Sequence, residues 1–212
     1  MSERIAIIDF ETTGMSPGHG ARAAEVGIVM IESGRVVDQF QSLMDAGQPM
    51  PWTITQLTGI STAMLRAAPP AETVMRDAAD FVGTAAMVAH NAAFDSKFWR
   101  DELQRVGRPG SHAFACTVLL SRRLYPEAPS HSLGRIVRHL GLPPAEKAHR
   151  ALADAQMTAH LLLRMQTDLR ERWHIPDPGH ALLQDLQACQ RKHLARTLEQ
   201  ASRRQLQPSL PW

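Results

Sequence analysis

The segment Ile5-Ala-Ile-Ile8, which runs directly into Asp9-Phe-Glu-Thr-Thr-Gly14, constrains the fold of this chain most. A continuous, largely β-branched run is typical of a strand buried on both faces at the centre of an α/β sheet. The turn-prone segment that follows carries two carboxylates at the point where this strand ends. Because open α/β sheets bind their ligands at the carboxyl ends of the strands, the sequence predicts a functional site here.

The rest of the pattern predicts a mixed sheet flanked by helices. Further strands are expected at residues 24–31 and 35–43, joined by a hairpin turn at Glu32-Ser-Gly34, and at 87–89. The first three strands would form a meander. Helical patterns cover residues 55–57, 70–81, 94–106, 116–124, 132–140 and 151–169. This order of elements indicates an α/β fold.

The length and composition favour one globular domain with an appendage. The 212 residues are 44% hydrophobic and 21% charged, which excludes disordered and fibrous classes. We expect a domain at residues 1–169, followed at 170–212 by a linker and a helical C-terminal extension, with one helical pattern at 181–205. No apolar run is long enough to span a membrane, no secretory signal is evident, and two cysteines cannot build a disulfide framework. These features predict a cytoplasmic protein without membrane contact.

Charge is distributed unevenly along the chain. Residues 1–99 carry 6 basic and 11 acidic side chains, whereas residues 100–212 carry 17 basic and 10 acidic ones. Arginine, which accounts for 20 of the 23 basic residues, forms bidentate contacts with phosphate. We expect part of a phosphate-binding surface among the arginines between residues 100 and 164, notably Arg122, Arg123, Arg135, Arg138 and Arg150. The alternative is codon usage in a GC-rich genome.

Three short motifs could carry chemistry, although each has a plain structural alternative. Asp9 and Glu11, two residues apart in an extended segment, point to the same side and would need a cation such as Mg²⁺ or Mn²⁺ if buried; otherwise they belong to a solvated loop. Asp95 ends the segment His90-Asn-Ala-Ala-Phe-Asp95 after the next buried strand, where it could also be an ordinary helix N-cap. His149 and Asp154 would face the same site only if His149 lies in the loop before the helix; otherwise His149 is a surface histidine.

In this order and context, the three motifs together resemble the DEDDh (DnaQ-like) 3′–5′ exonuclease family. D-F-E-T-T-G at 9–14, H-N-A-A-F-D at 90–95 and H-x4-D at 149–154 are similar to its three signatures. The likeness covers residues 4–166 and is closest to the exonuclease domain of the epsilon subunit of bacterial DNA polymerase III. The tyrosine-bearing sister group is excluded, because the single tyrosine, Tyr125, lies far from Asp154.

The resemblance implies a ribonuclease H-like fold and a two-metal-ion site. Two Mg²⁺ or Mn²⁺ ions would be held by Asp9, Glu11, Asp95 and Asp154, and His149 would act as general base; these five are the implied catalytic residues. Substrate-binding residues are implied around the same cleft, at Thr12, Thr13, Gly14, His90, Asn91 and Phe94. Phe94 could equally be a core residue of its helix, together with Phe98 at i+4.

The function that follows is removal of nucleoside 5′-monophosphates from single-stranded or frayed DNA 3′ ends, in repair, degradation or proofreading. One alternative is an exoribonuclease that trims RNA 3′ ends, and another is a polymerase-associated binding subunit with incidental nuclease activity. Residues 170–212 lack the glutamine-rich linker and polymerase-binding domain of epsilon subunits. The end of the chain, residues 205–212, is faintly similar to sliding-clamp-binding peptides, and the last helix could mediate a homodimer.

Overall fold

The computed structural model describes residues 3–145 and 149–206. Most of the segment that is similar to sliding-clamp-binding peptides, residues 207–212, therefore lies outside the described residues. A single mixed sheet has the strand order β3-β2-β1-β4-β5. Its strands are β1 (Arg4–Thr12), β2 (Ala23–Glu32), β3 (Arg35–Leu43), β4 (Ala86–Ala89) and β5 (Phe114–Cys116). The predicted meander is confirmed: β1 pairs antiparallel with β2 and β2 with β3, whereas β1, β4 and β5 run parallel.

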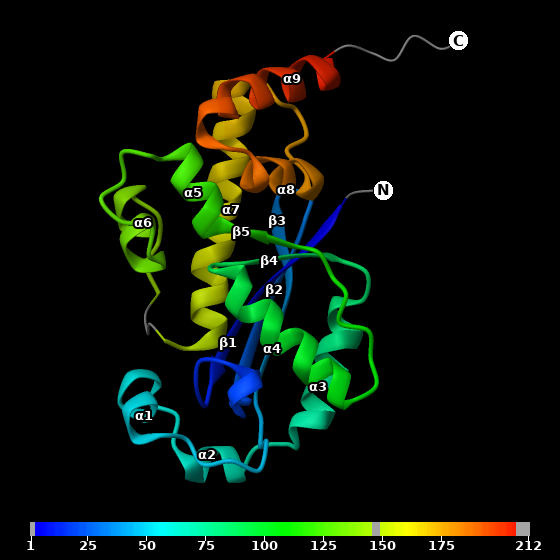
Figure 1. Ribbon diagram of the computed structural model, residues 1–212, viewed down its shortest axis with the longest axis vertical. Coiled ribbons are helices and arrows are strands. Elements are labelled where there is room, and N and C mark those ends of the chain that lie inside the picture. The colour runs from blue at the N-terminus through cyan, green and yellow to red at the C-terminus, as the bar shows by residue number, and fades with distance from the viewer. Residues whose placement is uncertain (1–2, 146–148, 207–212) are drawn as a thin grey trace.

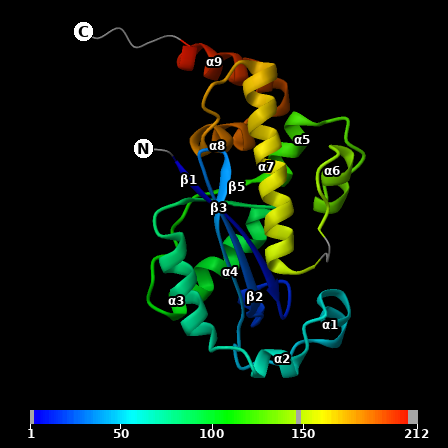
Figure 2. The ribbon, with the colours of Figure 1, turned by 180° about the vertical axis from the view of Figure 1, so that it is seen from behind.

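Helices cover both faces of this sheet (Figures 1 and 2). The helices between the strands are α1 (Trp52–Thr58), α2 (Thr62–Arg66), α3 (Ala71–Val82) and α4 (Ala92–Arg105). Those after β5 are α5 (Thr117–Leu124), α6 (Leu133–His139), α7 (Ala151–Trp173), α8 (His180–Ala188) and α9 (Leu194–Leu206), with short 3₁₀ turns η1 (Pro17–His19) and η2 (Arg191–His193). No helix in the described residues has the length and apolar character needed to cross a bilayer.

The alternation of side chains along β1 divides the core into two clusters. Ile5 and Ile7 face α7 and pack with its residues Ala155 and Leu162. On the opposite face, even-numbered residues of β1 such as Ile8 pack with α3 and α4. The central strand is therefore buried on both sides, as its continuous apolar run predicts.

Several element boundaries differ from those expected. β1 continues through Asp9 and Glu11 to Thr12, so the expected turn directly after Ile8 is wrong. The sequence does not predict strand β5 or helix α2, because segments of three and five residues are too short to show a hydrophobic periodicity. The single helix expected at 181–205 is interrupted after Ala188 and resumes at Leu194.

The C-terminal helices pack against the sheet. The side-chain amide of Gln187 in α8 accepts a hydrogen bond from the backbone N–H of Cys116 (2.6 Å) and donates one to the carbonyl of Phe114 (3.0 Å). This amide therefore satisfies backbone groups of β5, the edge strand, which would otherwise be unpaired. The Glu3 carboxylate, in turn, accepts the backbone N–H of His180 at 2.8 Å. The N-terminal end of the described chain is thus tied to the start of α8 at the end of the sheet away from Asp9.

Candidate active site

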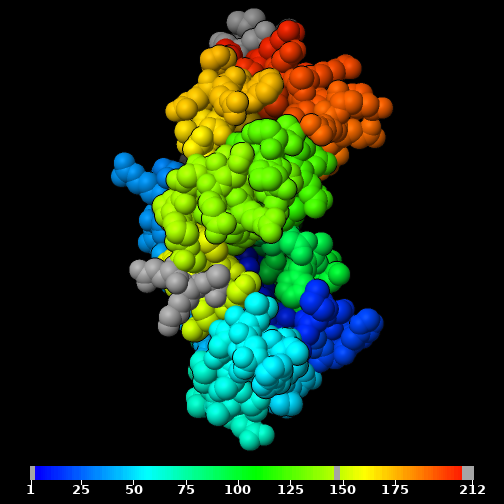
Figure 3. All heavy atoms as spheres, turned by 90° about the vertical axis from the view of Figure 1, so that its left-hand side faces the viewer, coloured from blue at the N-terminus to red at the C-terminus, as the bar shows by residue number. Residues whose placement is uncertain are grey.

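The carboxyl end of β1 presents Asp9 and Glu11 on the face that α7 covers. These side chains continue the row begun by Ile5 and Ile7, because residues two apart in a strand share a face. The predicted same-side placement of the two carboxylates is therefore confirmed. Figure 3 shows this end of the molecule as a hollow between the cyan α1 segment and the green and yellow helices, with blue N-terminal residues at its floor.

Asp154 joins the two strand carboxylates from the first turn of α7. One carboxylate oxygen of each of Asp9, Glu11 and Asp154 lies within 4.8 Å of the other two. Among the described residues, the buried Oδ1 of Asp154 has no hydrogen-bond partner. Oxygen ligands in this number suit a hard divalent cation, and an orphaned buried carboxylate oxygen is what such a cation would satisfy. The residues therefore fit a site for a hard divalent cation.

Asp95 approaches the same point from the opposite face of the sheet. It lies in the first turn of α4, where Asn91 is the N-cap, so the N-cap alternative for Asp95 is wrong. Its Oδ1 accepts a hydrogen bond from the backbone N–H of Phe10, between the two strand carboxylates, at 3.2 Å. Asp95 is outside the three-residue cluster, but its charge acts directly on Asp9.

Burial raises the pKa of every one of these carboxyls, and mutual repulsion adds to the rise at Asp9, Glu11 and Asp95. Burial, followed by the charges of Asp95 and Asp154, holds the pKa of Asp9 well above its usual range. Burial and the charge of Asp154 raise the pKa of Glu11 to about 7. The pKa of Asp95 rises to about 8, mainly by burial, against the opposing hydrogen bond from Phe10. Burial also raises the pKa of Asp154. A bound cation would reverse this cost by favouring the ionised forms.

His149 lies just before α7, as expected if it belongs to the loop that leads into the helix. It is exposed and has a positive φ of 60°, a conformation that non-glycine residues seldom adopt and that often marks functional sites. Its backbone N–H donates to the carboxyl group of Asp154, which opposes the rise in the pKa of that carboxyl. The structure thus brings His149 and Asp154 together at the N-terminal end of α7.

A buried glutamate that the sequence pattern did not single out fixes the start of α7. Glu25 of β2 is fully buried beside Glu11 in the sheet register. It accepts hydrogen bonds from Arg150 Nη2 (2.6 Å), from the backbone N–H of Ala151 (3.0 Å) and from the Gln41 amide (2.8 Å). Burial raises the pKa of Glu25, but these hydrogen bonds outweigh it and the pKa is lowered overall. The only available signal was a glutamate within an otherwise apolar strand.

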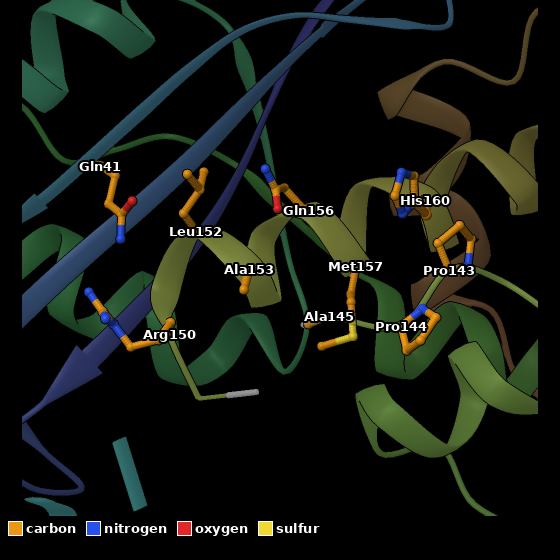
Figure 4. Close-up of a pocket in the computed structure, with 10 residues that line it drawn as sticks. All are labelled: Gln41, Pro143, Pro144, Ala145, Arg150, Leu152, Ala153, Gln156, Met157 and His160. Atoms are coloured by element: carbon orange, nitrogen blue, oxygen red, sulfur yellow. The ribbon is translucent and has the colours of Figure 1, made fainter. Parts of the chain in front are cut away.

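Arg150 is therefore paired with Glu25, and its expected part in a phosphate-binding surface stays a prediction. Figure 4 shows it beside Gln41 at the beginning of α7, next to a cavity of about 400 Å³ on the outer side of that helix. Asp9, Glu11 and Asp154 do not line this cavity. It is consequently a different place from the carboxylate cluster.

Gly27 allows α7 to approach the sheet at the position opposite Asp9. A Cβ at Gly27 would lie 2.2 Å from the backbone nitrogen of Leu152 and 2.3 Å from the carbonyl carbon of Ala151. Backbone atoms cannot yield as a side-chain tip can, so a side chain here must displace the helix. Gly27 and Glu25 together set where the first turn of α7 lies, and with it Asp154.

We therefore expect Gly27→Ala to lower both stability and turnover. Displacing α7 should cost about 1–3 kcal/mol, as overpacking does, and should widen the Asp154-to-Glu11 separation, which lowers kcat. Thermal unfolding and oligonucleotide hydrolysis measure the two effects. Gly134→Ala in α6 is the matched control, because a Cβ there meets nothing within 4 Å. Equal behaviour of the two variants would contradict this account of Gly27.

The Thr12–Gly14 segment leaves β1 beside the carboxylates. The Thr12 hydroxyl donates to the carbonyl of Gly14 (2.7 Å), and the Thr13 N–H donates to the carbonyl of Arg22 (2.9 Å). Thr13 and Gly14 line a cavity of about 340 Å³ together with Pro49 and Pro51. The segment is thus a rigid loop at the mouth of the site, and substrate contact by these residues remains a prediction.

His90, Asn91 and Phe94 occupy the corresponding position after β4. The His90 ring nitrogens contact the Thr117 hydroxyl (2.9 Å) and the His131 carbonyl (3.0 Å), and burial lowers the pKa of His90 to about 4. His90 therefore ties β4 to α5, and a substrate contact through a ring nitrogen would require the release of a partner. Asn91 is exposed with a φ of 73°. Phe94 is half-buried against Phe98, with ring centroids 4.9 Å apart.

The fold and this arrangement of acidic residues define a nuclease of the ribonuclease H-like class. A family model described as "Exonuclease" (RNase_T) matches residues 6–162, which is most of the chain. The chain belongs to this exonuclease family.

The relatives found by sequence include bacterial DNA polymerase III proteins. The chain is 34% identical over 175 residues to a DNA polymerase III PolC-type protein of Clostridium perfringens, covering 82% of this chain and 12% of that protein. It is 36% identical over 169 residues to a DNA polymerase III subunit epsilon-like protein of Rhodobacter capsulatus, covering 78% of this chain and 24% of that one. The chain therefore spans a small part of the length of these relatives.

Solved exonucleases share the fold. Exonuclease X, solved in complex with 5′ overhanging duplex DNA, is 26% identical with a TM-score of 0.66, covering 86% of this chain and 99% of that chain. The nuclease domain of 3′hExo, a DEDDh family member, has a TM-score of 0.67 at 21% identity, covering 79% of this chain and 93% of that chain. The expected ribonuclease H-like mixed sheet is thereby confirmed.

Proposed function

We propose that this protein is a metal-dependent 3′–5′ exonuclease that removes nucleoside 5′-monophosphates from single-stranded or frayed DNA ends. The observation that carries the proposal is the convergence of Asp9, Glu11 and Asp154 within 4.8 Å at the carboxyl end of β1. The choice of DNA is supported by the DNA polymerase III names of the relatives and by the DNA complex of exonuclease X. These relatives are also compatible with proofreading beside a polymerase.

In this proposal Asp9, Glu11, Asp95 and Asp154 would hold two Mg²⁺ or Mn²⁺ ions. When bound, the ions would supply Lewis-acid stabilisation of the scissile phosphate and of the leaving oxygen. His149, exposed at the start of α7, accepts the proton of the attacking water. Asp154 orients His149 through the backbone N–H, and the Thr12–Gly14 loop receives the terminal nucleotide at the adjacent cavity.

Product analysis tests this function most directly. Single-stranded DNA and RNA of matched sequence, labelled at the 5′ or 3′ end, are incubated with the protein and Mg²⁺ or Mn²⁺. We expect 5′-labelled DNA to shorten stepwise while 3′-labelled DNA releases a labelled mononucleotide at once. Release of mononucleotides from the 5′ end, or no hydrolysis with either metal, would overturn the proposal. Faster hydrolysis of the RNA than of the DNA would show that RNA is the substrate.

Metal binding should stabilise the protein more strongly at higher pH. Groups whose pKa is raised in the folded state make the metal-free protein less stable as pH rises, for Glu11 between its ordinary 4.5 and about 7. Mg²⁺ must displace these protons, so its stabilising effect should increase from pH 6 to pH 8.5. The shift in Tm caused by one fixed concentration of Mg²⁺, measured at each pH, checks this. A shift that is independent of pH would show that the carboxyls are already ionised without metal.

A further inference from the structure

A group of exposed basic side chains lies on the C-terminal helices, outside the site described above. Arg191, Lys192 and His193 form η2, and Arg196 follows in the first turn of α9; all four are exposed. Between Asp185 and Glu199 the chain contains no acidic residue. Four basic side chains within six residues thus face solvent, and the nearest acidic residue in the sequence is Glu199, three positions after Arg196.

Helix α5 brings a further arginine, Arg123, to the same surface. The Arg123 guanidinium donates from Nε to the carbonyl of Cys189, two residues before Arg191, at 3.0 Å. Its Nη1 donates to the carbonyl of Leu119 at 3.0 Å, so both contacts are with neutral groups. We call the surface formed by Arg123, Arg191, Lys192, His193 and Arg196 the basic strip.

The charge of the basic strip is not neutralised within the protein. Some other arginines are paired with carboxylates, among them Arg22 with Glu102 (2.8 Å) and Arg164 with Asp168 (3.0 Å), whereas others in the described residues, such as Arg35, make no ion pair. Within the described part of the chain, no member of the basic strip makes an ion pair. Like charges held together without counter-charges repel one another, and a polyanion would relieve that repulsion.

The basic strip is connected to the active site through α5. The first residue of this helix, Thr117, is bonded through its hydroxyl to His90, at the carboxyl end of β4. The 8 residues of α5 span about 12 Å at a rise of 1.5 Å per residue, and they end beside Arg122 and Arg123. The strip therefore begins about 12 Å from the cleft, the length of α5. It continues onto η2 and α9, at the end of the molecule that carries α9 in Figure 1.

We propose that the basic strip is a second nucleic-acid-binding surface, which holds the phosphates of the strand upstream of the 3′ end being degraded. This inference rests on the proposed nuclease function and extends it to residues 191–196. Arginine is suited to bidentate phosphate contacts, and phosphate contacts position a strand without reading its sequence. The surface would therefore increase affinity for long strands of any sequence and would leave the chemistry at the carboxylates unchanged.

Length dependence of binding separates this surface from the cleft. The variant Arg191→Gln/Lys192→Gln/Arg196→Gln and the unchanged protein are titrated with 5′-fluorescein dT30 and dT4 in metal-free buffer. For dT30 we expect the variant to bind on the order of tenfold more weakly at 0.1 M salt. The slope of log affinity against log salt should fall by about 2, because each phosphate that the variant no longer neutralises removes about 0.7 from it. For dT4, which fills only the cleft, the two proteins should bind within twofold of each other.

Controls separate a local effect from a general reduction in charge and from failure of the proposed function. Arg35→Gln/Arg76→Gln/Arg100→Gln removes three exposed arginines from β3, α3 and α4 and should leave dT30 binding unchanged. Both triple variants should hydrolyse the p-nitrophenyl ester of thymidine 5′-monophosphate with the kcat of the unchanged protein. If no protein hydrolyses it, the nuclease proposal fails, while dT30 binding still tests the strip. Two results with the Arg191→Gln/Lys192→Gln/Arg196→Gln variant would overturn the proposal. One is an affinity and salt slope for dT30 that equal those of the unchanged protein, which would favour an acidic protein as the partner of the strip. The other is a loss of affinity for dT4 as large as the loss for dT30.

Discussion

Asp154→Asn is expected to lower the rate of DNA hydrolysis by about 10³-fold or more at saturating Mg²⁺, which corresponds to the several kcal/mol that a positioned metal contributes to the transition state. Asp154 supplies one of the three carboxylates that lie within 4.8 Å of one another. The amide keeps the shape of the side chain but cannot carry the charge that holds a cation. Equivalent losses are expected for Asp9→Asn and Glu11→Gln.

The same variant should stabilise the metal-free protein at neutral pH. Removing one charge relieves the repulsion that, after burial, raises the pKa of Asp9 and of Glu11. The Tm of Asp154→Asn without metal should therefore equal or exceed that of the unchanged protein at pH 7.5, while its increase with Mg²⁺ should be abolished. Asp77→Asn, an exposed position in α3, is the matched control for both measurements. Near-normal turnover of Asp154→Asn, or a large fall in its metal-free Tm, would mean that Asp154 has a structural role instead.

The central strand and the order of the motifs could be predicted because both depend on local pattern. A continuous apolar run identifies a buried strand, and the spacing of two carboxylates identifies their common face. What the sequence could not show is how far the strand continues. Pairing with Glu25 and Ala23 of β2 keeps Glu11 and Thr12 in the strand, although local propensity favours a turn.

The residues that position α7 could not be found from local pattern, because their roles arise from contacts distant in the sequence. Glu25 meets Arg150 across 125 positions, and Gly27 matters only because the backbone of Leu152 lies against it. The break between α8 and α9 likewise follows from packing, since α8 fits against β5 through Gln187. These contacts determine the geometry of a site whose composition could be predicted from three motifs.

His149→Ala is expected to reduce kcat by roughly 10²–10⁴-fold, the usual contribution of positioned acid–base catalysis. The side chain is exposed at the entrance to the cluster, held by a backbone conformation with φ of 60° and by the N–H contact to Asp154. Because the backbone contact does not depend on the imidazole, the alanine variant should retain its affinity for Mg²⁺ and for DNA. Steady-state kinetics and metal-induced Tm shifts measure these separately.

A general base and a phosphate-binding residue predict different kinetics for this variant. Removal of a group that acts only in the transition state lowers kcat and kcat/KM together, whereas removal of a group that only binds substrate raises KM and leaves kcat unchanged. His139→Ala in α6, a surface histidine 4.0 Å from Glu127, should change neither parameter and controls for the removal of an imidazole. A normal kcat with a raised KM in His149→Ala would assign His149 to substrate binding, and proton transfer would then have to be carried by another group at the end of β1 or α7.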